Sequence, residues 1–324
     1  MTYAIRIHKT GGPEVLSWEA VTVGKPRRGE VRLRHTAVGL NFIDIYHRSG
    51  LYPVQLPVVL GLEAAGVVEE VGPDTIEFKP GDRVAYASAP LGAYAEERLI
   101  PADRLLKLPG SISDQQAAAM MLKGITAQFL VCRTFPVKAG DTILIHAAAG
   151  GVGLIVCQWA AALGATVIGT VGSEEKAAVA QAHGCAHPIV YTREDFVQRV
   201  QEITDGRKAD VVYDSVGRET FMKSLDCLWP LGMMVTFGQS SGPVPPFDLG
   251  LLSAKGSLFL TRPSIGTYTA TRQDLVTSAS DLFRMVESGE VKVPIGQTYP
   301  LREAACAHRD LEARKTTSAT VLTV

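Results

Sequence analysis

The sequence TILIHAAAGGVG, residues 142–153, joins a short apolar run to a glycine-rich turn, and an apolar segment of helical period follows it to Leu163. A strand, a glycine turn and a helix in this order let backbone N–H groups at the helix N-terminus approach a pyrophosphate. In the pattern G-x-G-x-x-G, Ala148 takes the first position, and Gly150 and Gly153 take the other two. Glycine turns also serve close strand–helix packing, so the surrounding βαβ pattern is what favours a dinucleotide site.

Strands and helices alternate around this loop from about Gly124 onward. Helical periodicity over residues 152–163, 173–183 and 194–204 separates the first four of six apolar runs. Those runs predict buried parallel strands at 142–147, 165–171, 188–191, 209–216, 233–238 and 257–261. Right-handed βαβ units of this spacing predict an α/β fold with a doubly wound sheet of six strands.

The first 120 or so residues carry a different pattern, in which glycine and proline turns separate short β segments. Strands are expected at 3–9, 31–38, 66–71 and 83–86, and no helix is expected before Asp114. This pattern predicts a compact, partly closed β-barrel-type domain. Two helices, 271–288 and 302–314, and a strand, 318–324, are expected to fold back onto this domain.

Composition narrows the class of protein. The chain has 324 residues, of which 46% are hydrophobic and 20% charged, as expected for a soluble globular protein of two domains. The net charge of −1 and the lack of a long basic run make nucleic acid an improbable partner, and no apolar stretch is long enough to span a membrane. Five widely spaced cysteines and an N-terminus that starts as a strand predict a cytoplasmic protein.

The end of the second strand of the sheet bears on which dinucleotide is bound. An NAD site would place Asp or Glu there to bind the ribose, but residues 169–173 read Gly-Thr-Val-Gly-Ser. Lys176 follows one helical turn later, where it could pair with a phosphate, and NADPH is therefore favoured. In the alternative, Lys176 is a solvated surface residue and Glu174 or Glu175 binds the ribose.

With these features in place, the chain resembles the zinc-free medium-chain dehydrogenase/reductase proteins, and among them the bacterial NADPH:quinone oxidoreductases related to ζ-crystallin. The resemblance extends over essentially all 324 residues. Its motifs are Val38–Asp44, Gly61–Val68, Ala147–Gly153 with Gln158, Tyr213–Gly217 and Thr261–Ser264.

The resemblance implies a GroES-like substrate domain, 1–123, completed by 263–324, and a Rossmann NADPH-binding domain, 124–262, with the cofactor in the cleft between them. It implies that Ser173, Lys176, Tyr191 and Arg314 surround the 2′-phosphate. It further implies a homodimer joined at the last strand of the sheet, 257–261. The other cofactor-binding residues that it implies are Asn41, Tyr46, Thr126, Gly150, Gly151, Val152, Gly153, Ser215, Phe237, Gly238, Gln239, Ser240, Arg262, Pro263 and Ser264.

No metal is expected. Zinc alcohol dehydrogenases bind their catalytic metal through a Cys and a His, and the matching positions here are Asn41 and Leu62. Leucine cannot ligate a metal and a neutral amide is a poor zinc ligand. No cysteine precedes Cys132, so a four-cysteine zinc lobe is missing too. Glu63 is interpreted as a structural hydrogen-bond acceptor.

Hydride transfer needs no nucleophilic triad, because the cofactor carries the chemistry. A hydrogen-bond donor near the acceptor would help, and the candidate catalytic residues are Asn41, Tyr46 and Tyr52. The two tyrosines are interpreted first as apolar pocket walls and second as proton donors. His146, inside an apolar strand, is interpreted as a core residue, and His47 is noted for its position near the tyrosines.

Three functions compete at this point. The leading hypothesis is an NADPH-dependent reductase of quinones. The alternatives are a reductase of enoyl or enone substrates and a nucleotide-binding, crystallin-like structural protein.

Overall fold

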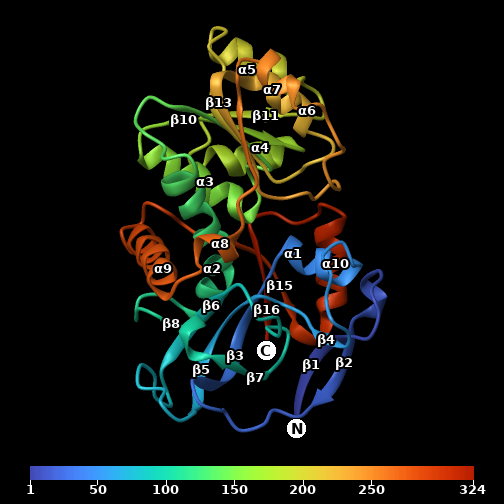
Figure 1. Ribbon diagram of the computed structural model, residues 1–324, viewed down its shortest axis with the longest axis vertical. Coiled ribbons are helices and arrows are strands. Elements are labelled where there is room, and N and C mark those ends of the chain that lie inside the picture. Colours follow the sequence, from blue (N-terminus) through green and yellow to red (C-terminus); the bar gives the residue numbers. More distant parts are fainter. The chain divides into compact units, whose positions relative to one another are not determined.

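The computed structural model describes residues 1–324, and the chain packs into two compact units (Figure 1). The first unit comprises Met1–Ile125, Thr269–Phe283 and Val293–Val324, and the second comprises Thr126–Tyr268 and Arg284–Lys292. Residues 284–292 join the second unit because Gln158 bonds both backbone groups of Lys292, at 2.9 Å each. The domain boundaries and domain roles that the sequence predicts stay predictions.

The second unit is built on a six-stranded parallel sheet in the order β11-β10-β9-β12-β13-β14. This confirms the predicted doubly wound α/β sheet. The strand bounds are β9 (Thr142–His146), β10 (Thr166–Val171), β11 (His187–Val190), β12 (Ala209–Asp214), β13 (Leu228–Thr236) and β14 (Phe259–Thr261). Strand β13 begins five residues before its predicted start, and its pairing with β12 is irregular between Ala209 and Val211.

Helices connect these strands. Helices α3 (Gly151–Ala162) and α4 (Glu174–Gln181) pack against β9, β10 and β11. Helices α5 (Phe196–Ile203) and α6 (Phe221–Ser224) bury Phe196 and Phe221 against Leu144 and Val212 of the sheet. The unit also contains the π-helical turn η3 (Leu130–Thr134), the 3-10 turn η4 (Leu225–Cys227), α7 (Gly250–Ala254) and α8 (Ile265–Tyr268). Because all six strands run in one direction, the loops that follow them gather at one edge of the sheet.

The first unit contains two sheets. The larger has the order β15-β16-β3-β5-β6-β8, with β7 pairing on β3, and the smaller has the order β2-β1-β4. The bounds are β1 (Thr2–Ile7), β2 (Ser17–Val21), β3 (Glu30–Leu40), β4 (Val58–Val59), β5 (Glu63–Val71), β6 (Arg83–Ala87), β7 (Glu97–Pro101), β8 (Leu106–Lys107), β15 (Ile295–Pro300) and β16 (Ala319–Thr323). Strand β16 pairs antiparallel with β3, so the last strand of the chain lies beside one from its first forty residues.

One prediction for this unit is wrong: a helix precedes Asp114. Helix α1 spans Phe42–Ser49 and ends at Gly50, whose φ of 84° requires the left-handed conformation that glycine adopts readily. At its start the carboxylate of Asp44 accepts from the backbone N–H of Asn41 at 2.9 Å. Eight residues give little more than two turns, too short for the periodicity to stand out among β segments.

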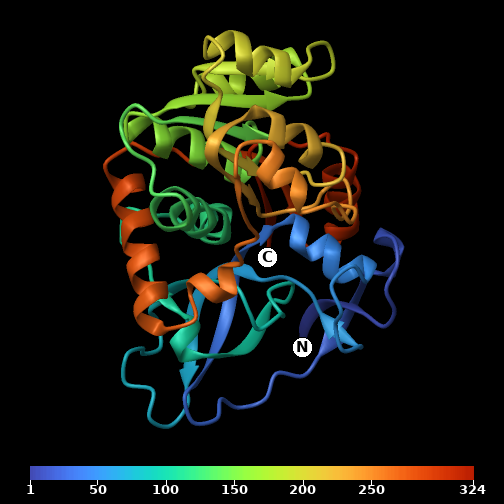
Figure 2. The ribbon, with the colours of Figure 1, turned by 45° about the horizontal axis from the view of Figure 1, so that its top comes forward.

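The remaining helices of the first unit are longer. Helix α2 spans Asp114–Phe129, and α9 (Arg272–Glu287) packs against it (Figure 2). A Cβ on Gly124 would lie 2.4 Å from the Leu282 side chain, so the small residue permits this contact. Helix α10 (Ala304–Glu312) and the 3-10 turns η1 (Pro13–Val15), η2 (Ala102–Arg104) and η5 (Leu301–Glu303) complete the unit. No helix combines the length and the apolar character that crossing a membrane requires.

Candidate functional site

The turn after β9 leaves no room for a side chain at Gly153. Ala147 has φ of 56°, and Gly150 caps the N-terminus of α3. A Cβ on Gly153 would lie 2.3 Å from the carbonyl oxygen of Ala147, closer than real Cβ contacts come. The backbone at Gly153 therefore packs directly against the backbone of Ala147. Close approach of an anion to the backbone N–H groups of a helix N-terminus fits this first turn of α3, which contains Gly150, Gly151, Val152 and Gly153.

The packing around Ala148 explains why an alanine can take the first position of the glycine pattern. Its side chain is buried, and its N–H donates to the carbonyl of Thr170 at 3.1 Å. A Cβ on Gly169 would lie 2.6 Å from the Cβ of Ala148. The small side chain of Ala148 thus packs against β10, and the residue at positive φ is its neighbour Ala147.

Three of the predicted phosphate-binding residues come together where β10 and β11 end. Ser173 caps α4, and its Oγ accepts from the N–H of Lys176 at 3.3 Å. Tyr191 directly follows β11, and its hydroxyl would lie 3.1 Å from a Cβ placed on Gly172. Tyr191 is 41% exposed.

The acids proposed as alternative ribose ligands are occupied by other contacts. Glu174 forms an ion pair with Arg193. A hydrogen bond with Ser173 lowers the pKa of Glu175. Glu174 already has a cationic partner, which favours Lys176 as the residue that selects the cofactor.

The loops after β12, β13 and β14 also meet at this edge. The backbone N–H of Ser240 donates to the carbonyl of Ser215 at 3.1 Å. The guanidinium of Arg262 donates to Thr236 Oγ1 at 3.3 Å and reaches the carbonyl of Gly238. These contacts therefore bring together three segments of the chain: Ser215, then Phe237, Gly238, Gln239 and Ser240, and finally Arg262, Pro263 and Ser264.

A buried carboxylate holds these loops in place. Asp214, fully buried at the end of β12, accepts from the N–H groups of Val216 and Gly217 at 2.7 and 3.0 Å. It also accepts from the hydroxyl of Thr220. His146 is buried nearby on β9, bonded to Thr170 and Ser224, and is the core residue that the sequence predicts.

Two predicted cofactor ligands lie elsewhere. Thr126 lies on α2 and is buried. Arg314 follows α10 in the first unit, with an exposed side chain and φ of 57°. The predicted role of Arg314 at the 2′-phosphate stays a prediction.

In the first unit, the candidate catalytic tyrosines lie in an aromatic cluster on and after α1. The rings of Tyr46 and Tyr52 have centroids 5.2 Å apart, and Phe42 and His47 extend the cluster at 6.3 and 5.8 Å. Burial lowers the pKa of His47, which favours its neutral form. Rings packed on one another favour the pocket-wall interpretation, and a proton-donor role stays a prediction.

Asn41 lies beside this cluster and contacts two acids. Its backbone N–H donates to Asp44, and its Nδ2 donates to Glu63 Oε2 at 2.8 Å. Glu63 is thus the hydrogen-bond acceptor that the sequence predicts. Leu62, at the other position where zinc enzymes carry a ligand, is buried, and no group of three or more His, Cys, Asp or Glu side chains in the structure could hold a metal ion.

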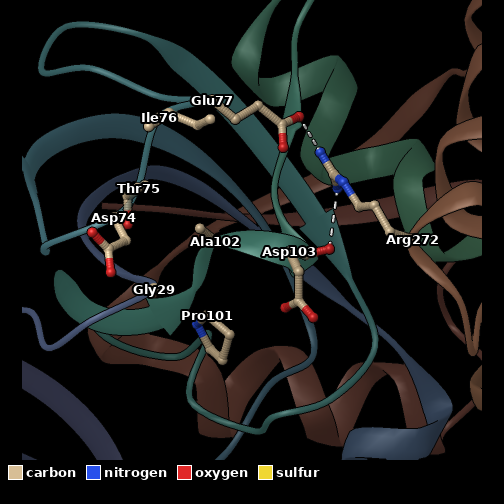
Figure 3. A pocket seen from close by; sticks show the side chains of 9 residues that line it. All are labelled: Gly29, Asp74, Thr75, Ile76, Glu77, Pro101, Ala102, Asp103 and Arg272. Carbon is tan, nitrogen blue, oxygen red and sulfur yellow. Dashed lines mark hydrogen bonds and ion pairs between the residues drawn. The ribbon is translucent and has the colours of Figure 1, made fainter.

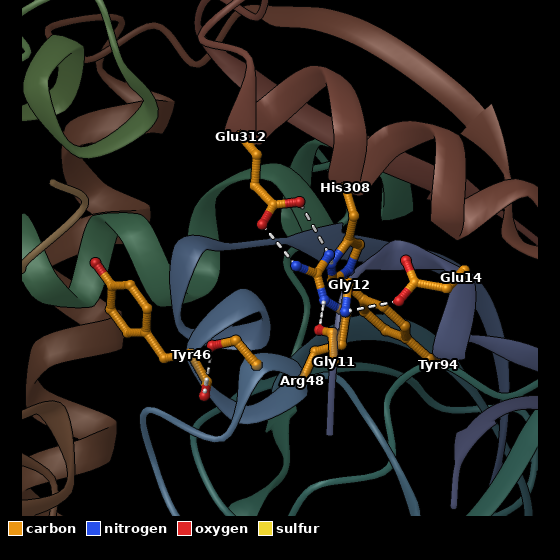
Figure 4. Close-up of polar contacts among 9 residues, drawn as sticks. Gly11, Gly12, Glu14, Tyr46, Arg48, Tyr94, His308 and Glu312 are labelled. Atoms are coloured by element: carbon orange, nitrogen blue, oxygen red, sulfur yellow. Dashed lines mark hydrogen bonds and ion pairs between the residues drawn. The ribbon is translucent and has the colours of Figure 1, made fainter. Parts of the chain in front are cut away.

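A chain of polar groups leads from α10 to the start of α1, and Figure 4 shows its members Arg48, Tyr94, His308 and Glu312. Arg48 forms an ion pair with Glu312 at 2.6 Å and contacts His308 Nδ1 at 3.2 Å. The hydroxyl of Tyr94 lies 3.0 Å from His308 Nε2 and donates to Asp44 Oδ2 at 3.0 Å. In Figure 4 the ring of Tyr46 points away from the guanidinium of Arg48, so the two side chains serve different sides of α1.

Burial shifts the pKa values along this chain. It raises the pKa of Asp44 to about 7, although Asn41, Tyr94 and Lys123 act in the opposite direction. It lowers the pKa of His308 to about 3, and nearby Arg48 acts in the same direction. Sequence reasoning missed this chain, and its one local signal was Asp44, an acid three residues after Asn41 at a helix start.

A separate hollow of about 450 Å³ lies on the surface of the first unit (Figure 3). Its lining includes Asp74, Glu77 and Asp103, and the guanidinium of Arg272 bonds Glu77 and the carbonyl of Asp103. None of the predicted site residues lines it.

A β-rich unit and a second unit built on a parallel sheet, whose first strand leads into a glycine-rich turn at a helix N-terminus, define a dehydrogenase-type oxidoreductase. Family models agree: residues 27–110 match the alcohol dehydrogenase GroES-like domain, and residues 151–283 match the zinc-binding dehydrogenase family. The chain belongs to the medium-chain dehydrogenase/reductase family, among its quinone oxidoreductases.

Individual relatives match over nearly their whole length. The chain is 52% identical to a quinone oxidoreductase of Pseudomonas aeruginosa and 49% identical to a 2-haloacrylate reductase of Burkholderia, in each case over 99% of both chains. A solved structure of Escherichia coli quinone oxidoreductase complexed with NADPH superposes with a TM-score of 0.98 at 49% identity, over 100% of both chains.

Proposed function

We propose that this protein is an NADPH-dependent reductase of quinones that works without a metal ion in the cytoplasm. The observation that carries the proposal is the turn after β9, where a Cβ on Gly153 would lie 2.3 Å from a backbone oxygen. Such a turn at the carboxyl edge of a parallel sheet fits a dinucleotide pyrophosphate. The choice of acceptor rests on relatives named quinone oxidoreductases at about half identity.

The residues of the second unit bind and orient the cofactor. Gly150–Gly153 would hold the pyrophosphate, while Ser173, Lys176 and Tyr191, with Arg314, would bind the 2′-phosphate by charge and hydrogen bonding. The segments 237–240 and 262–264, with Ser215 and Thr126, would flank the nicotinamide half. When bound, NADPH supplies the hydride.

The residues of the first unit receive the acceptor. The packed rings of Tyr46 and Tyr52 would form an apolar wall on which a quinone could stack. With Asn41 and Leu62 at the metal positions, no Lewis acid polarises the acceptor, so the acceptor must already be electron-poor. The quinone oxygen takes its proton from water after hydride transfer.

A second candidate function has a specific observation behind it. The chain is nearly as similar to a 2-haloacrylate reductase as to the quinone oxidoreductases. An α,β-unsaturated carboxylate is also an electron-poor hydride acceptor, so reduction of activated alkenes is the alternative.

Both candidate functions can be tested by measuring the oxidation of NADPH, from its absorbance, with a panel of acceptors. We expect quinones to give the highest kcat/KM, simple aldehydes to give none, and a chelator to leave the rate unchanged. Faster turnover with unsaturated carbonyls than with any quinone would replace the first function by the second. Binding of NADPH with no turnover of any acceptor would instead favour the structural role.

The proposal includes a homodimer joined along β14. This strand pairs only with β13 and ends the sheet, and Phe259 on β14 and Leu231 on β13 are 56% and 66% exposed. Trp229 and Leu260 are also exposed, so an apolar patch lies at an open sheet edge. Light scattering should give twice 34.7 kDa for the wild type. A monomer at micromolar concentration would contradict the proposal.

A further inference from the structure

Glu63 is a fully buried carboxylate with three donors directed at it. Nδ2 of Asn41 and Nζ of Lys123 each lie 2.8 Å from its Oε2, and the backbone N–H of Leu122 lies 2.7 Å from its Oε1. The three donors come from the end of β3 and from the middle of α2. Glu63 therefore joins the helix to the segment that carries Asn41.

The chain keeps space for this carboxylate at Gly39. A Cβ on Gly39 would lie 2.1 Å from Glu63 Oε2 and 2.3 Å from the carbonyl oxygen of Ala118. The glycine is needed here for its size, since its φ is not positive. A side chain on β3 at this point would displace the carboxylate from Asn41.

Glu63 determines which way the amide of Asn41 faces. A carboxylate only accepts hydrogen bonds, so the amino group of Asn41 must face Glu63, and its carbonyl Oδ1 is turned away. The backbone of Asn41 is fixed separately by Asp44. Both ends of the residue are thus held.

Lys123 is the charge partner of Glu63. Burial of a carboxylate is costly unless it is paired and hydrogen-bonded. The ammonium of Lys123, only 5% exposed, lies 2.8 Å from Glu63 Oε2 and holds the carboxylate between α2 and Asn41.

We propose that Glu63 and Lys123 are positioning residues that fix Asn41 so that it presents its carbonyl oxygen to the cofactor. The ligand group recognised would be a donor, either a hydroxyl or an amide N–H of the nucleotide. This inference rests on the proposed function, because it needs Asn41 to contact NADPH.

A double-mutant cycle on NADPH binding tests it, with dissociation constants from fluorescence titration of the full-length protein. Glu63→Gln keeps the shape and an acceptor for Leu122 but directs an amino group at Asn41. We expect NADPH binding to weaken about tenfold, the effect of one lost or mismatched buried hydrogen bond. In an Asn41→Ala background the same substitution should change binding by less than about twofold, because its effect passes through Asn41.

The control is Glu97→Gln, which removes another carboxylate paired with a cation, Arg32, in the same sheet. It should leave NADPH binding unchanged. If Glu63→Gln does not fold, the same double-mutant cycle is carried out with Lys123→Met in place of Glu63→Gln. Lys123→Arg, which keeps the positive charge, is then expected to bind NADPH as the wild type does. If neither folds, NMR of the wild type decides: the Asn41 side-chain amino protons should exchange slowly with solvent, and rapid exchange would overturn the proposal.

Three results of the cycle would also overturn it: no weakening by Glu63→Gln in the wild-type background, equal weakening with and without Asn41, or no effect of Asn41→Ala itself. Failure of the wild type to bind NADPH would overturn the proposed function and this inference together. If the wild type binds NADPH and Glu63→Gln binds it equally well, the inference alone would be overturned.

Discussion

The guanidinium of Arg48 lies 3.2 Å from Nδ1 of His308, and this contact sets the direction of the buried hydrogen-bond chain that ends at Asp44. A guanidinium only donates, so Nδ1 must accept and the proton of the neutral imidazole lies on Nε2. Nε2 then donates to the hydroxyl of Tyr94, whose own proton goes to Asp44 Oδ2. The other oxygen of Asp44, Oδ1, is buried and has no partner.

Asp44 should therefore make stability depend on pH. Because burial raises its pKa to about 7, its contribution is complete below the unfolded value near 4 and is lost as the pH rises through 7. Between about pH 5 and pH 8, the free energy of unfolding of Asp44→Asn should rise by about 2–3 kcal/mol relative to the wild type. Urea denaturation at the two pH values measures this. Four histidines with lowered pKa values, His35, His47, His146 and His308, change stability with pH in the opposite direction, but both proteins contain them. A difference that does not change with pH would show that Asp44 keeps an ordinary pKa.

Lys176 should determine the preference for NADPH over NADH. Loss of a charge-assisted contact with phosphate should weaken NADPH binding by about 1.5–3 kcal/mol in Lys176→Ala and leave NADH binding nearly unchanged. The ratio of the two dissociation constants measures the effect. Lys138→Ala is a matched control, because Lys138 is exposed and precedes β9, at the opposite edge of the sheet. An unchanged ratio in Lys176→Ala would remove this lysine from the site.

Gly153 and Gly150 should respond differently to a methyl group. In Gly153→Ala the Cβ would lie 2.3 Å from a backbone oxygen, whereas in Gly150→Ala the nearest atom would be 3.1 Å away. Overpacking of this kind costs about 1–3 kcal/mol, so Gly153→Ala should lower the thermal midpoint and NADPH affinity while Gly150→Ala changes stability little. Thermal denaturation with and without NADPH separates the two effects. Equal stability of the two variants would mean that the turn tolerates a side chain.

Tyr46 and Tyr52 should act through shape. Replacement of either by Phe keeps the ring contacts and should leave kcat within about threefold of the wild type, since a true general acid contributes about 10²-fold or more. Replacement by Ala removes a wall of the pocket and should raise KM for the quinone. Steady-state kinetics with saturating NADPH distinguishes the cases. A fall of about 10²-fold in kcat for either Phe variant, with cofactor binding intact, would identify a proton donor.

The sheet of the second unit could be predicted because its strands are buried on both faces and therefore appear as uninterrupted apolar runs. The start of β13 could not, because Pro230 and Gly232 interrupt its apolar pattern, and Leu231 between them has φ of 65°. The cofactor-binding loops could be predicted as well, because each loop comes directly after one of these strands.

The site of the first unit was only partly predictable. Asn41, Tyr46 and Tyr52 are close in sequence and came from the family resemblance. The buried groups around them are far apart along the chain: Glu63, which bonds Asn41, begins β5, its partner Lys123 lies on α2, and His308, which contacts Arg48 and Tyr94, lies on α10. Only the pairing of strands from both ends of the chain brings such residues together, and sequence periodicity carries no information about that pairing.

Strand β16, residues 319–323, hydrogen-bonds to both β3 and β15 in the larger sheet of the first unit. During synthesis, the ribosome therefore releases β3 and the strands that follow it long before this partner of β3 exists. The parallel sheet of the second unit is complete once residue 261 has emerged, so it can fold while β3 still presents an open edge. For the nascent chain, that edge is exposed to mispairing, and a ribosome that stalls before residue 319 leaves it unprotected.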